Sequence, residues 1–238
     1  MPAASEPRAP SKRVAFVTIG QSPRVDVMGE LLPRLGPGIE AVEYGALDDL
    51  ERDQIAGLAP EGCEERLCTR LRDGTEVVIT KDWTLRRLQA LMHRLDGAGF
   101  DLIVLLCTGT FEGLSAKTPM VEAQEVLDGA VRDLARDGSR VGVMVPLEAQ
   151  IAEFEGHEVG YRPARVTHAS PYSDARLAAA GSELAEMDLI AMHCMGYTEA
   201  MRDEVARVSG RPTLLARSLL AEAIAERVRQ PDALQSIS

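Results

Sequence analysis

The segments LIVLLCTGT at residues 102–110 and LIAMHCMGYT at residues 189–198 decide the fold class of this 238-residue chain. Short apolar runs bounded by turn residues are typical of buried strands in parallel sheets. An aspartate precedes each run, and each run ends on a cysteine, Cys107 or Cys194, that is followed by a small turn. The two thiols are therefore expected at the carboxyl ends of two strands, the edge where α/β proteins bind ligands.

Strands alternate with amphipathic helices along the rest of the chain. Strands separated by helices of this length predict parallel sheets. Only the Asp-Gly pair at residues 73–74 interrupts the alternation of strands and helices. It predicts a β-hairpin formed by residues 67–71 and 75–80. Other strands are expected at 13–19, 39–46, 140–145, 164–168 and 213–216, and helices at 25–35, 83–95, 122–135, 147–154, 174–185, 199–208 and 218–228.

These elements predict an α/β fold made of two Rossmann-like parallel-sheet halves. The likeness of the two cysteine segments suggests that a pseudo-twofold axis relates the halves and that the active-site cleft lies between them. The hairpin near residues 67–80 is an insertion. We expect a disordered tail at 1–12, a first α/β domain at 13–107 plus 215–230, and a second α/β domain at 108–214.

Composition and charge exclude several classes of partner. A net charge of −11 argues against nucleic acid and against an anionic membrane surface, since both need clustered cations. No apolar run approaches the ~20 residues of a membrane-spanning helix, and the first residues lack the apolar core of a secretory signal. A cytoplasmic location with reduced cysteines is therefore expected. A homodimer is possible, since dimers are the commonest assembly, although no interface is evident.

No metal or cofactor motif is present in the sequence. Cys63 and Cys68 are five positions apart with no histidine nearby, which fits no zinc spacing, so a structural role is expected for both. The glycines after Cys107 do not form a phosphate-binding loop, because that motif needs a lysine directly after its last glycine and Lys117 is four residues beyond Gly113. No dinucleotide-binding glycine motif occurs either.

The pair Cys107 and Cys194 has the chemistry of two acid/base groups. A free thiol has a pKa of about 8.5, so a polar cleft could hold one as thiolate and the other as thiol near neutrality. That arrangement suits racemisation, in which one side removes a proton from a carbon next to a carboxylate and the other returns one. The alternative is that both are inert strand residues, because free cysteine is commonly buried.

The turns after the cysteines and the loop after the first strand could hold the substrate carboxylate. Backbone N–H groups and hydroxyls suit an anion, and Arg24 could form a bidentate pair with it. Helix capping by the threonines and solvent exposure of the arginine are the alternatives. Strand alternation turns His193 away from the site, towards a supporting or core role. The candidate binding residues are Gly20, Gln21, Ser22, Arg24, Lys81, Thr108, Gly109, Thr110, Pro146, Gly196, Tyr197 and Thr198.

Four motifs together resemble the AroM family over residues 13–228: TIGQSPR at 18–24, LCTGT at 106–110, VGVMVPLE at 141–148 and CMGY at 194–197. That family looks like a distant relative of the aspartate/glutamate/hydantoin racemase superfamily. The resemblance implies two α/β domains around a cleft, no metal or organic cofactor, and proton transfer by the two cysteines. It also implies that the residues after each cysteine and the first loop anchor the substrate carboxylate.

The sequence therefore predicts a cofactor-independent racemase or epimerase that acts on a small carboxylate-bearing molecule. The first loop lacks Asp-Ser-Gly and the second lacks Cys-Thr-His, which argues against glutamate and aspartate as substrates. One alternative is a single-cysteine isomerase or decarboxylase, like the maleate isomerase and arylmalonate decarboxylase relatives. The other is a small-carboxylate sensor that keeps the cleft without chemistry.

Overall fold

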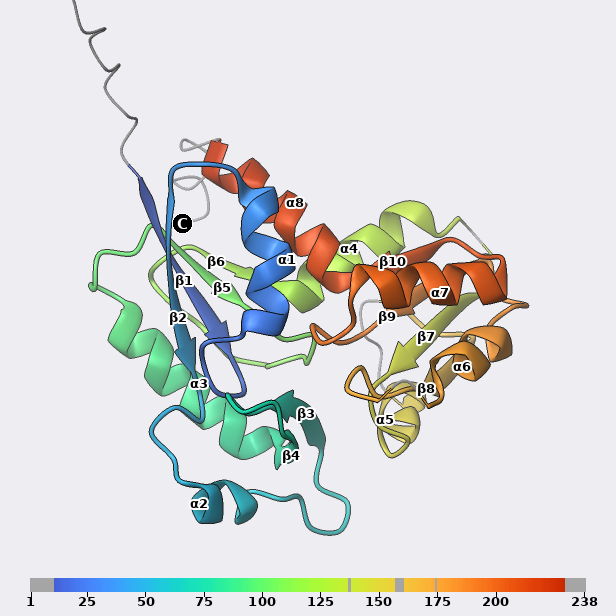
Figure 1. Cartoon of the computed structure of the whole chain (residues 1–238), viewed down its shortest axis with the longest axis horizontal. Coiled ribbons are helices and arrows are strands. Elements are labelled where there is room, and N and C mark those ends of the chain that lie inside the picture. Colours follow the sequence, from blue (N-terminus) through green and yellow to red (C-terminus); the bar gives the residue numbers. More distant parts are fainter. Residues whose placement is uncertain (1–10, 137, 157–160, 174, 230–238) are drawn as a thin grey trace, which may run out of the picture.

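The computed structural model describes residues 11–136, 138–156, 161–173 and 175–229. Two four-stranded parallel sheets lie side by side, each covered by helices (Figure 1). The first sheet contains β1 (Lys12–Thr18), β2 (Ile39–Gly45), β5 (Leu102–Leu105) and β6 (Met120–Glu122). The second contains β7 (Val141–Val145), β8 (Arg165–His168), β9 (Leu189–Met192) and β10 (Thr213–Leu215).

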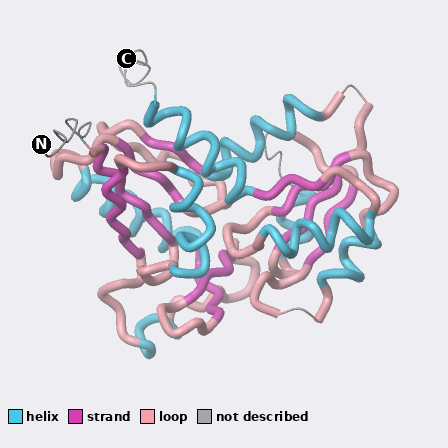
Figure 2. Tube along the Cα trace, turned by 45° about the horizontal axis from the view of Figure 1, so that its top comes forward, coloured by secondary structure: helices cyan, strands magenta, loops and turns pink. Residues whose placement is uncertain are grey.

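The helices connect these strands in the expected α/β order. Figure 2 shows the strands of the two parallel sheets gathered in two groups with helices around both. The helices are α1 (Val25–Leu35), α2 (Arg52–Ala56), α3 (Lys81–Leu95), α4 (Ala123–Leu134), α5 (Gln150–Gly156), α6 (Leu177–Glu183), α7 (Glu199–Ser209) and α8 (Ala216–Arg229).

The two sheets have the same strand order. The first runs β2-β1-β5-β6 and the second β8-β7-β9-β10, so in each parallel sheet the first and third strands in chain order are the central neighbours. The aspartates before the cysteine strands have matching contacts. The Asp101 carboxylate accepts the backbone N–H of Arg13 at 2.8 Å, and that of Asp188 accepts the N–H of Arg140 at 2.7 Å. The repeat inferred from sequence is thus a repeat of topology and of strand-start contacts.

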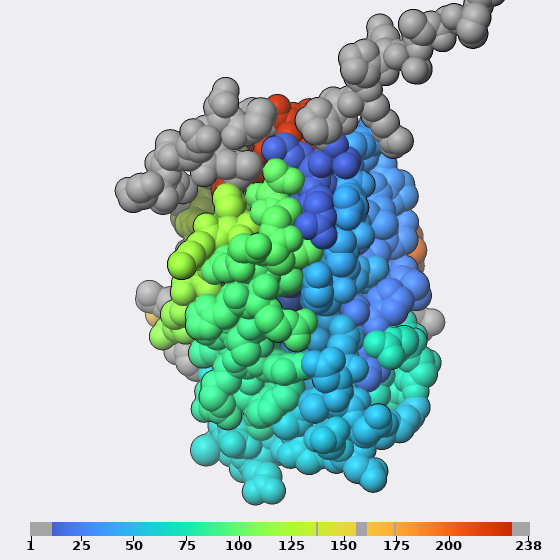
Figure 3. All heavy atoms as spheres, turned by 90° about the vertical axis from the view of Figure 1, so that its left-hand side faces the viewer, coloured from blue at the N-terminus to red at the C-terminus, as the bar shows by residue number. Residues whose placement is uncertain are grey.

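Each central strand is buried on both faces, as its unbroken apolar sequence indicates. In β1, Val14 and Phe16 pack with the apolar residues of α1, α4 and α8, whereas Ala15 and Val17 face those of α3. The side of the first half that carries α3 faces the viewer in Figure 3. Burying a large apolar side chain contributes about 1.5–3 kcal/mol, so these two layers fix the strand that leads into the first loop.

The hairpin consists of β3 (Arg66–Arg70) and β4 (Glu76–Thr80), which pair antiparallel. Its turn contains Gly74 at φ +91°, a conformation that favours glycine. The hairpin reaches from the first half to the second. Arg66 forms an ion pair with Glu153 of α5 at 3.0 Å, and the Glu76 carboxylate accepts the Ser170 hydroxyl at 2.6 Å.

Several details differ from the sequence expectations. Residues 1–10 of the expected tail and residue 230 lie outside the described residues, and Lys12 already begins β1. Three-residue β6 pairs with β5 in the first sheet, although it falls within the 108–214 range expected for the second domain. Helix α6 begins at Leu177 and is shorter than expected, and Asp174 lies outside the described residues.

The C-terminal helix α8 follows the second sheet but lies beside α1 and α4 (Figure 1). Its residues Leu220 and Ile224 are fully buried in the first half's core. Within the described residues, no helix is both long and apolar enough to cross a membrane.

Candidate active site

Both predicted cysteines line one cavity of about 430 Å³ between the two halves. Cys107 follows β5 and Cys194 follows β9, so each thiol comes after the third strand, in chain order, of its own parallel sheet. The cavity lies at the carboxyl ends of the parallel strands, as expected for an open α/β sheet. Both side chains are nearly buried, with 7% and 8% exposed.

The turns that present the two thiols are equivalent. The backbone N–H of Gly109 donates to Cys107 Sγ at 3.3 Å, and the N–H of Gly196 donates to Cys194 Sγ at 3.3 Å. In each turn, the N–H that bonds to the thiol therefore belongs to the residue two positions after the cysteine. Gly196 also allows a close approach, because a Cβ there would fall 2.7 Å from Pro171 Cγ.

Burial dominates the acid/base state of these thiols. It raises the pKa of Cys107 to about 12 and raises that of Cys194, because a thiolate is poorly solvated there. The glycine N–H groups and the Arg24 charge lower both pKa values without offsetting burial. Both shifts favour the neutral thiol near neutral pH, which differs from the sequence-based expectation of one thiolate.

Arg24 lines the cavity, but its guanidinium is paired with a carboxylate of the same chain. Only 4% of the residue is exposed, and Nε and Nη2 donate to the two Asp26 oxygens at 2.9 and 2.8 Å. Nη1 donates to the Thr18 hydroxyl at 3.2 Å, and Nη2 also lies 3.2 Å from the Tyr172 hydroxyl. The bidentate pairing expected with a substrate is made here with Asp26, which holds the positive charge close to the thiols.

Other predicted residues also line the cavity. Lys81 does so with its Nζ paired to Glu65 at 3.1 Å. Thr108 and Thr110 also belong to the lining, and no hydrogen bond of their hydroxyls is found within the described part of the chain. The predicted residues found in the lining are Arg24, Lys81, Cys107, Thr108, Gly109, Thr110, Pro146, Cys194 and Gly196.

The predicted first-loop residues Gly20, Gln21 and Ser22 do not line the cavity. A Cβ on Gly20 would fall 2.4 Å from the Arg70 carbonyl oxygen, so the loop runs against the hairpin. The backbone N–H of Gln21 donates to that same carbonyl at 3.3 Å. Ser22 donates to the Asp48 carboxylate from its backbone N and its hydroxyl, both at 2.7 Å. These residues hold the loop from which Arg24 extends.

Tyr197 and Thr198 also have structural partners rather than positions in the cavity lining. The buried Tyr197 hydroxyl donates to the Ala169 carbonyl at 2.6 Å. The Thr198 hydroxyl accepts the backbone N–H of Met201 at 3.2 Å and caps α7, which is the capping alternative considered for it.

The hairpin supplies a wall that sequence reasoning missed. Cys68 of β3, expected to be structural, lines the cavity, and burial raises the pKa of its thiol. Tyr172, in the loop after β8, lines it too. The hairpin strands were predicted, but nothing in their sequence indicates that they face the second half. Further lining residues not singled out from the sequence include Glu65, Arg66, Gln150, Glu153 and Phe154. His193, for which the sequence predicted a supporting or core role, also belongs to the lining.

Arg217, at the start of α8, holds the turn of the second cysteine. Its Nε and Nη2 donate to the Met195 carbonyl at 3.2 and 2.6 Å, and its Nη1 donates to the Asp26 carbonyl at 2.9 Å. It is 2% exposed, so these bonds are shielded from water. One buried cation thus connects the Cys194 turn to the start of α1, and no sequence motif marked it.

In the regions that the structure describes, no group of three or more His, Cys, Asp or Glu side chains could hold a metal ion. Cys63, Cys68, Cys107 and Cys194 are all free thiols.

Comparisons with known proteins support a racemase-like fold. The family described as AroM protein matches residues 14–228. A search of curated proteins found no match. Allantoin racemase from Klebsiella pneumoniae superimposes with a TM-score of 0.61 at 16% identity, covering 92% of this chain and 88% of that one.

Two further solved structures are similar. Glutamate racemase from Thermus thermophilus has a TM-score of 0.60 at 15% identity and covers 97% of this chain and 86% of its own. Nocardia farcinica maleate cis-trans isomerase, solved with a covalently bound succinylcysteine intermediate, has a TM-score of 0.58 at 17% identity and covers 92% and 93%. At sequence identities of 15–17%, these structural similarities show that the three proteins and this chain share a fold.

Proposed function

The chain belongs to the AroM family, and from that premise we propose that it is a cofactor-independent racemase- or epimerase-like enzyme. It would move a proton at a carbon next to a carboxylate of a small molecule, with Cys107 and Cys194 as the acid/base groups. The observation that carries the proposal is the matched setting of the two thiols. Each comes after the third strand, in chain order, of its own parallel sheet, accepts an N–H at 3.3 Å, and lines the same cavity.

The reaction needs one thiolate and one thiol at a time. The thiolate removes the proton from the carbon, and the thiol on the opposite side then donates its own proton to the resulting carbanion. Ionised Cys194 raises the pKa of Cys107, so the two groups disfavour simultaneous ionisation. The Arg24 charge favours the thiolate at either position. The thiols supply both proton transfers, so the proposal requires no metal or organic cofactor.

The substrate carboxylate has donors beside the first cysteine. Thr108, Thr110 and Tyr172 all line the cavity, and the Tyr172 hydroxyl lies 3.2 Å from Arg24 Nη2. Anchoring the carboxylate there would hold the neighbouring carbon close to the thiols, which raises the rate by fixing the geometry of proton transfer. A cavity of about 430 Å³ suits a small metabolite.

Deuterium exchange tests the proposal directly. Amino acids, hydantoins, hydroxy acids and keto acids are incubated with the protein in D₂O, and deuterium uptake and optical rotation are followed. Cys107→Ser and Cys194→Ser should each slow exchange by roughly 10²–10⁴-fold, the usual contribution of a general acid or base. Cys63→Ser, which changes an exposed thiol, serves as the control.

The outcome separates the candidate functions. If either site variant exchanges at the wild-type rate, the two-thiol assignment is wrong. Binding of a carboxylate without any exchange would instead indicate a sensor.

A single-cysteine isomerase or decarboxylase is the second candidate. The maleate isomerase of the same fold carries a covalent succinylcysteine, and the two thiols here have unlike neighbours. Arg217 lowers and Glu76 raises the pKa of Cys194, whereas Glu122 raises the pKa of Cys107. A substrate adduct found by mass spectrometry on one cysteine alone would favour this candidate.

A cytoplasmic location, proposed from the four free thiols, would be checked by cell fractionation.

A further inference from the structure

The two halves are joined on one side by a shared apolar core. Residues of α1, α4 and α8 pack in one cluster with Val141 of β7 and with Leu189 and Ala191 of β9. The chain also crosses between the halves here, from α4 into β7 and from β10 into α8. In Figure 1 these three helices lie in the upper part of the molecule and the hairpin in the lower part. Separating the halves at this core would expose apolar surface to water, which is unfavourable.

The hairpin is attached to the first half by its apolar residues. Leu67 of β3, Ile79 of β4 and Leu71 in the turn are buried in the cluster on the α3 side of the first sheet. Every described member of that cluster lies between residues 15 and 120. The hairpin therefore belongs to the rigid body of the first half.

The contacts of β3 with helix α5 of the second half are polar. Arg66 Nε forms its ion pair with Glu153 at 3.0 Å. The Arg66 carbonyl accepts an N–H from the Gln150 side chain at 3.1 Å. Both partners in α5 line the cavity, so these contacts close one of its sides.

The contacts with the loop after β8 are also polar. The Ser170 hydroxyl donates to the Glu76 carboxylate at 2.6 Å, and the Arg70 guanidinium lies over the Tyr172 ring, 5.2 Å from its centre. Among the described residues, no residue of β3 or β4 belongs to an apolar cluster that contains residues of the second half. The hairpin thus has an apolar attachment to one half and a polar attachment to the other.

These two kinds of contact differ in what it costs to break them. Water can replace the partner of a hydrogen bond or of a partly exposed ion pair, so each such contact contributes little net free energy. Water cannot replace the packing of an apolar core. The halves therefore separate more readily at the hairpin than at the core of α1, α4 and α8.

We propose that the cleft opens and closes at the hairpin. The apolar core of α1, α4 and α8 is the hinge, and the polar contacts of Arg66, Arg70 and Glu76 with the second half are a latch. Cys107 follows a strand of the first half and Cys194 a strand of the second, so the latched form presents both thiols to one cavity. The inference goes beyond the proposed function, because a latch exists whatever reaction the cavity supports.

Alkylation by iodoacetamide measures how often the nearly buried thiols become accessible. Rates at Cys107 and Cys194 are determined by peptide mass spectrometry at pH 8, and the exposed Cys63 in the same sample reports the reactivity of the reagent. When opening is fast relative to alkylation, the rate follows the population of the open form. Glu153→Gln and Ser170→Ala, which each remove one latch contact, should raise both rates by roughly threefold to tenfold. The second variant does so without changing any charge.

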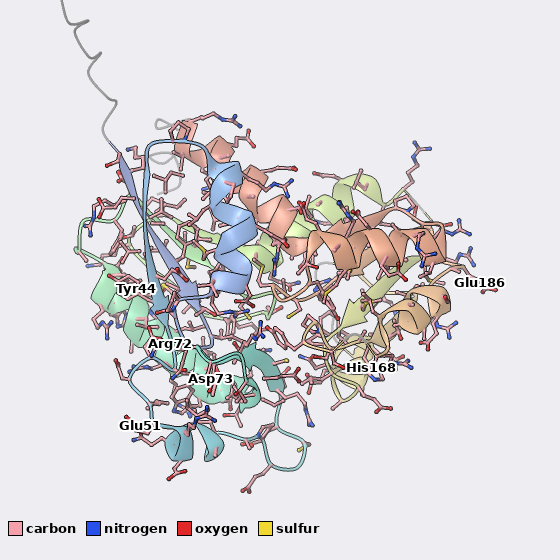
Figure 4. The ribbon with its side chains drawn as sticks, viewed as in Figure 1. Tyr44, Glu51, Arg72, Asp73, His168 and Glu186 are labelled. Carbon is pink, nitrogen blue, oxygen red and sulfur yellow. The ribbon has the colours of Figure 1, made fainter. Side chains whose placement is uncertain are left out.

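Asp73→Asn is the matched control. Asp73 lies in the turn of the same hairpin (Figure 4), and its carboxylate pairs with Arg52 of α2, within the first half. The resulting Asn-Gly pair keeps a sequence that favours the turn. Both alkylation rates should stay at the wild-type value, because the substitution removes a hairpin carboxylate without removing a contact to the second half.

Salt provides a second test on the same samples. At about 1 M sodium chloride the Debye length is ~3 Å, which weakens the Arg66–Glu153 pair. Wild-type rates at Cys107 and Cys194 should rise relative to Cys63, and Glu153→Gln should respond less. Unchanged rates in both latch variants, or an equal rise in Asp73→Asn, with all proteins folded by circular dichroism, would refute the latch. Because alkylation requires no turnover, that failure is distinguishable from a failure of the racemase proposal.

Discussion

Replacing Arg217 by methionine tests how the turn of the second cysteine is held. The substitution keeps much of the side-chain volume and removes the guanidinium. Three hydrogen bonds disappear, two to the Met195 carbonyl and one to the Asp26 carbonyl, together with the ion pair to Glu30 at 2.8 Å. Because Arg217 is 2% exposed, water cannot readily replace these donors.

The size of the effect can be worked out from these contacts. A buried carbonyl left without its donor costs about 1–3 kcal/mol, and disrupting a buried charge network costs about 3–5 kcal/mol in total. We expect Arg217→Met to lower the free energy of unfolding by about 3–4 kcal/mol. With a urea dependence of about 3 kcal/mol/M, the midpoint should fall by roughly 1 M.

The assay is urea unfolding followed by circular dichroism, with Arg207→Met as the control. Arg207 is on the surface of α7, where its only ion pair among the described residues is with the adjacent Glu204. Its replacement should leave the midpoint unchanged, since exposed pairs contribute little. If both variants shift the midpoint equally, the buried contacts of Arg217 do not stabilise the protein as reasoned here.

Two further predictions concern the thiols and their turns. Because burial raises the pKa of Cys107 to about 12, its alkylation by iodoacetamide should still accelerate at pH 10, and Arg24→Met should slow it at pH 8 by removing a charge that lowers this pKa. A rate that levels off near pH 8.5 would contradict this. Gly196→Ala should destabilise the protein by about 1–3 kcal/mol through its clash with Pro171, whereas Gly29→Ala, in an open part of α1, should be neutral or stabilising in thermal melts. Equal melting temperatures for these variants would argue against a tight turn.

The elements and the paired cysteines could be predicted because local sequence determines them. Helix α1 was predicted at residues 25–35, its observed bounds, because its apolar spacing and the Gly-Pro-Gly after it are both local signals. Strands β5 and β9 are unbroken apolar runs, so their ends and the thiols after them were also evident.

The remaining features depend on contacts between distant residues. Strand β6 has three residues, too few to show any periodicity. Cys68 reaches the cavity because the hairpin folds across to the second half, and Arg217 is defined by partners 22 and 191 positions away. The imidazole of His193 packs against Phe154 and Tyr161, as alternation indicated, but the sequence could not show that the cavity lining extends to this residue.

The unlike surroundings of the two cysteines have a kinetic consequence for any racemisation carried out in this cleft. Two enantiomers have equal free energy in water, so the equilibrium constant is one and kcat/KM must be the same in both directions. The different charges that act on the two thiols, Arg217 and Glu76 on Cys194 and Glu122 on Cys107, therefore cannot make the enzyme a better catalyst for one enantiomer at low concentration. Their asymmetry can appear only as kcat and KM values that differ between the enantiomers by the same factor.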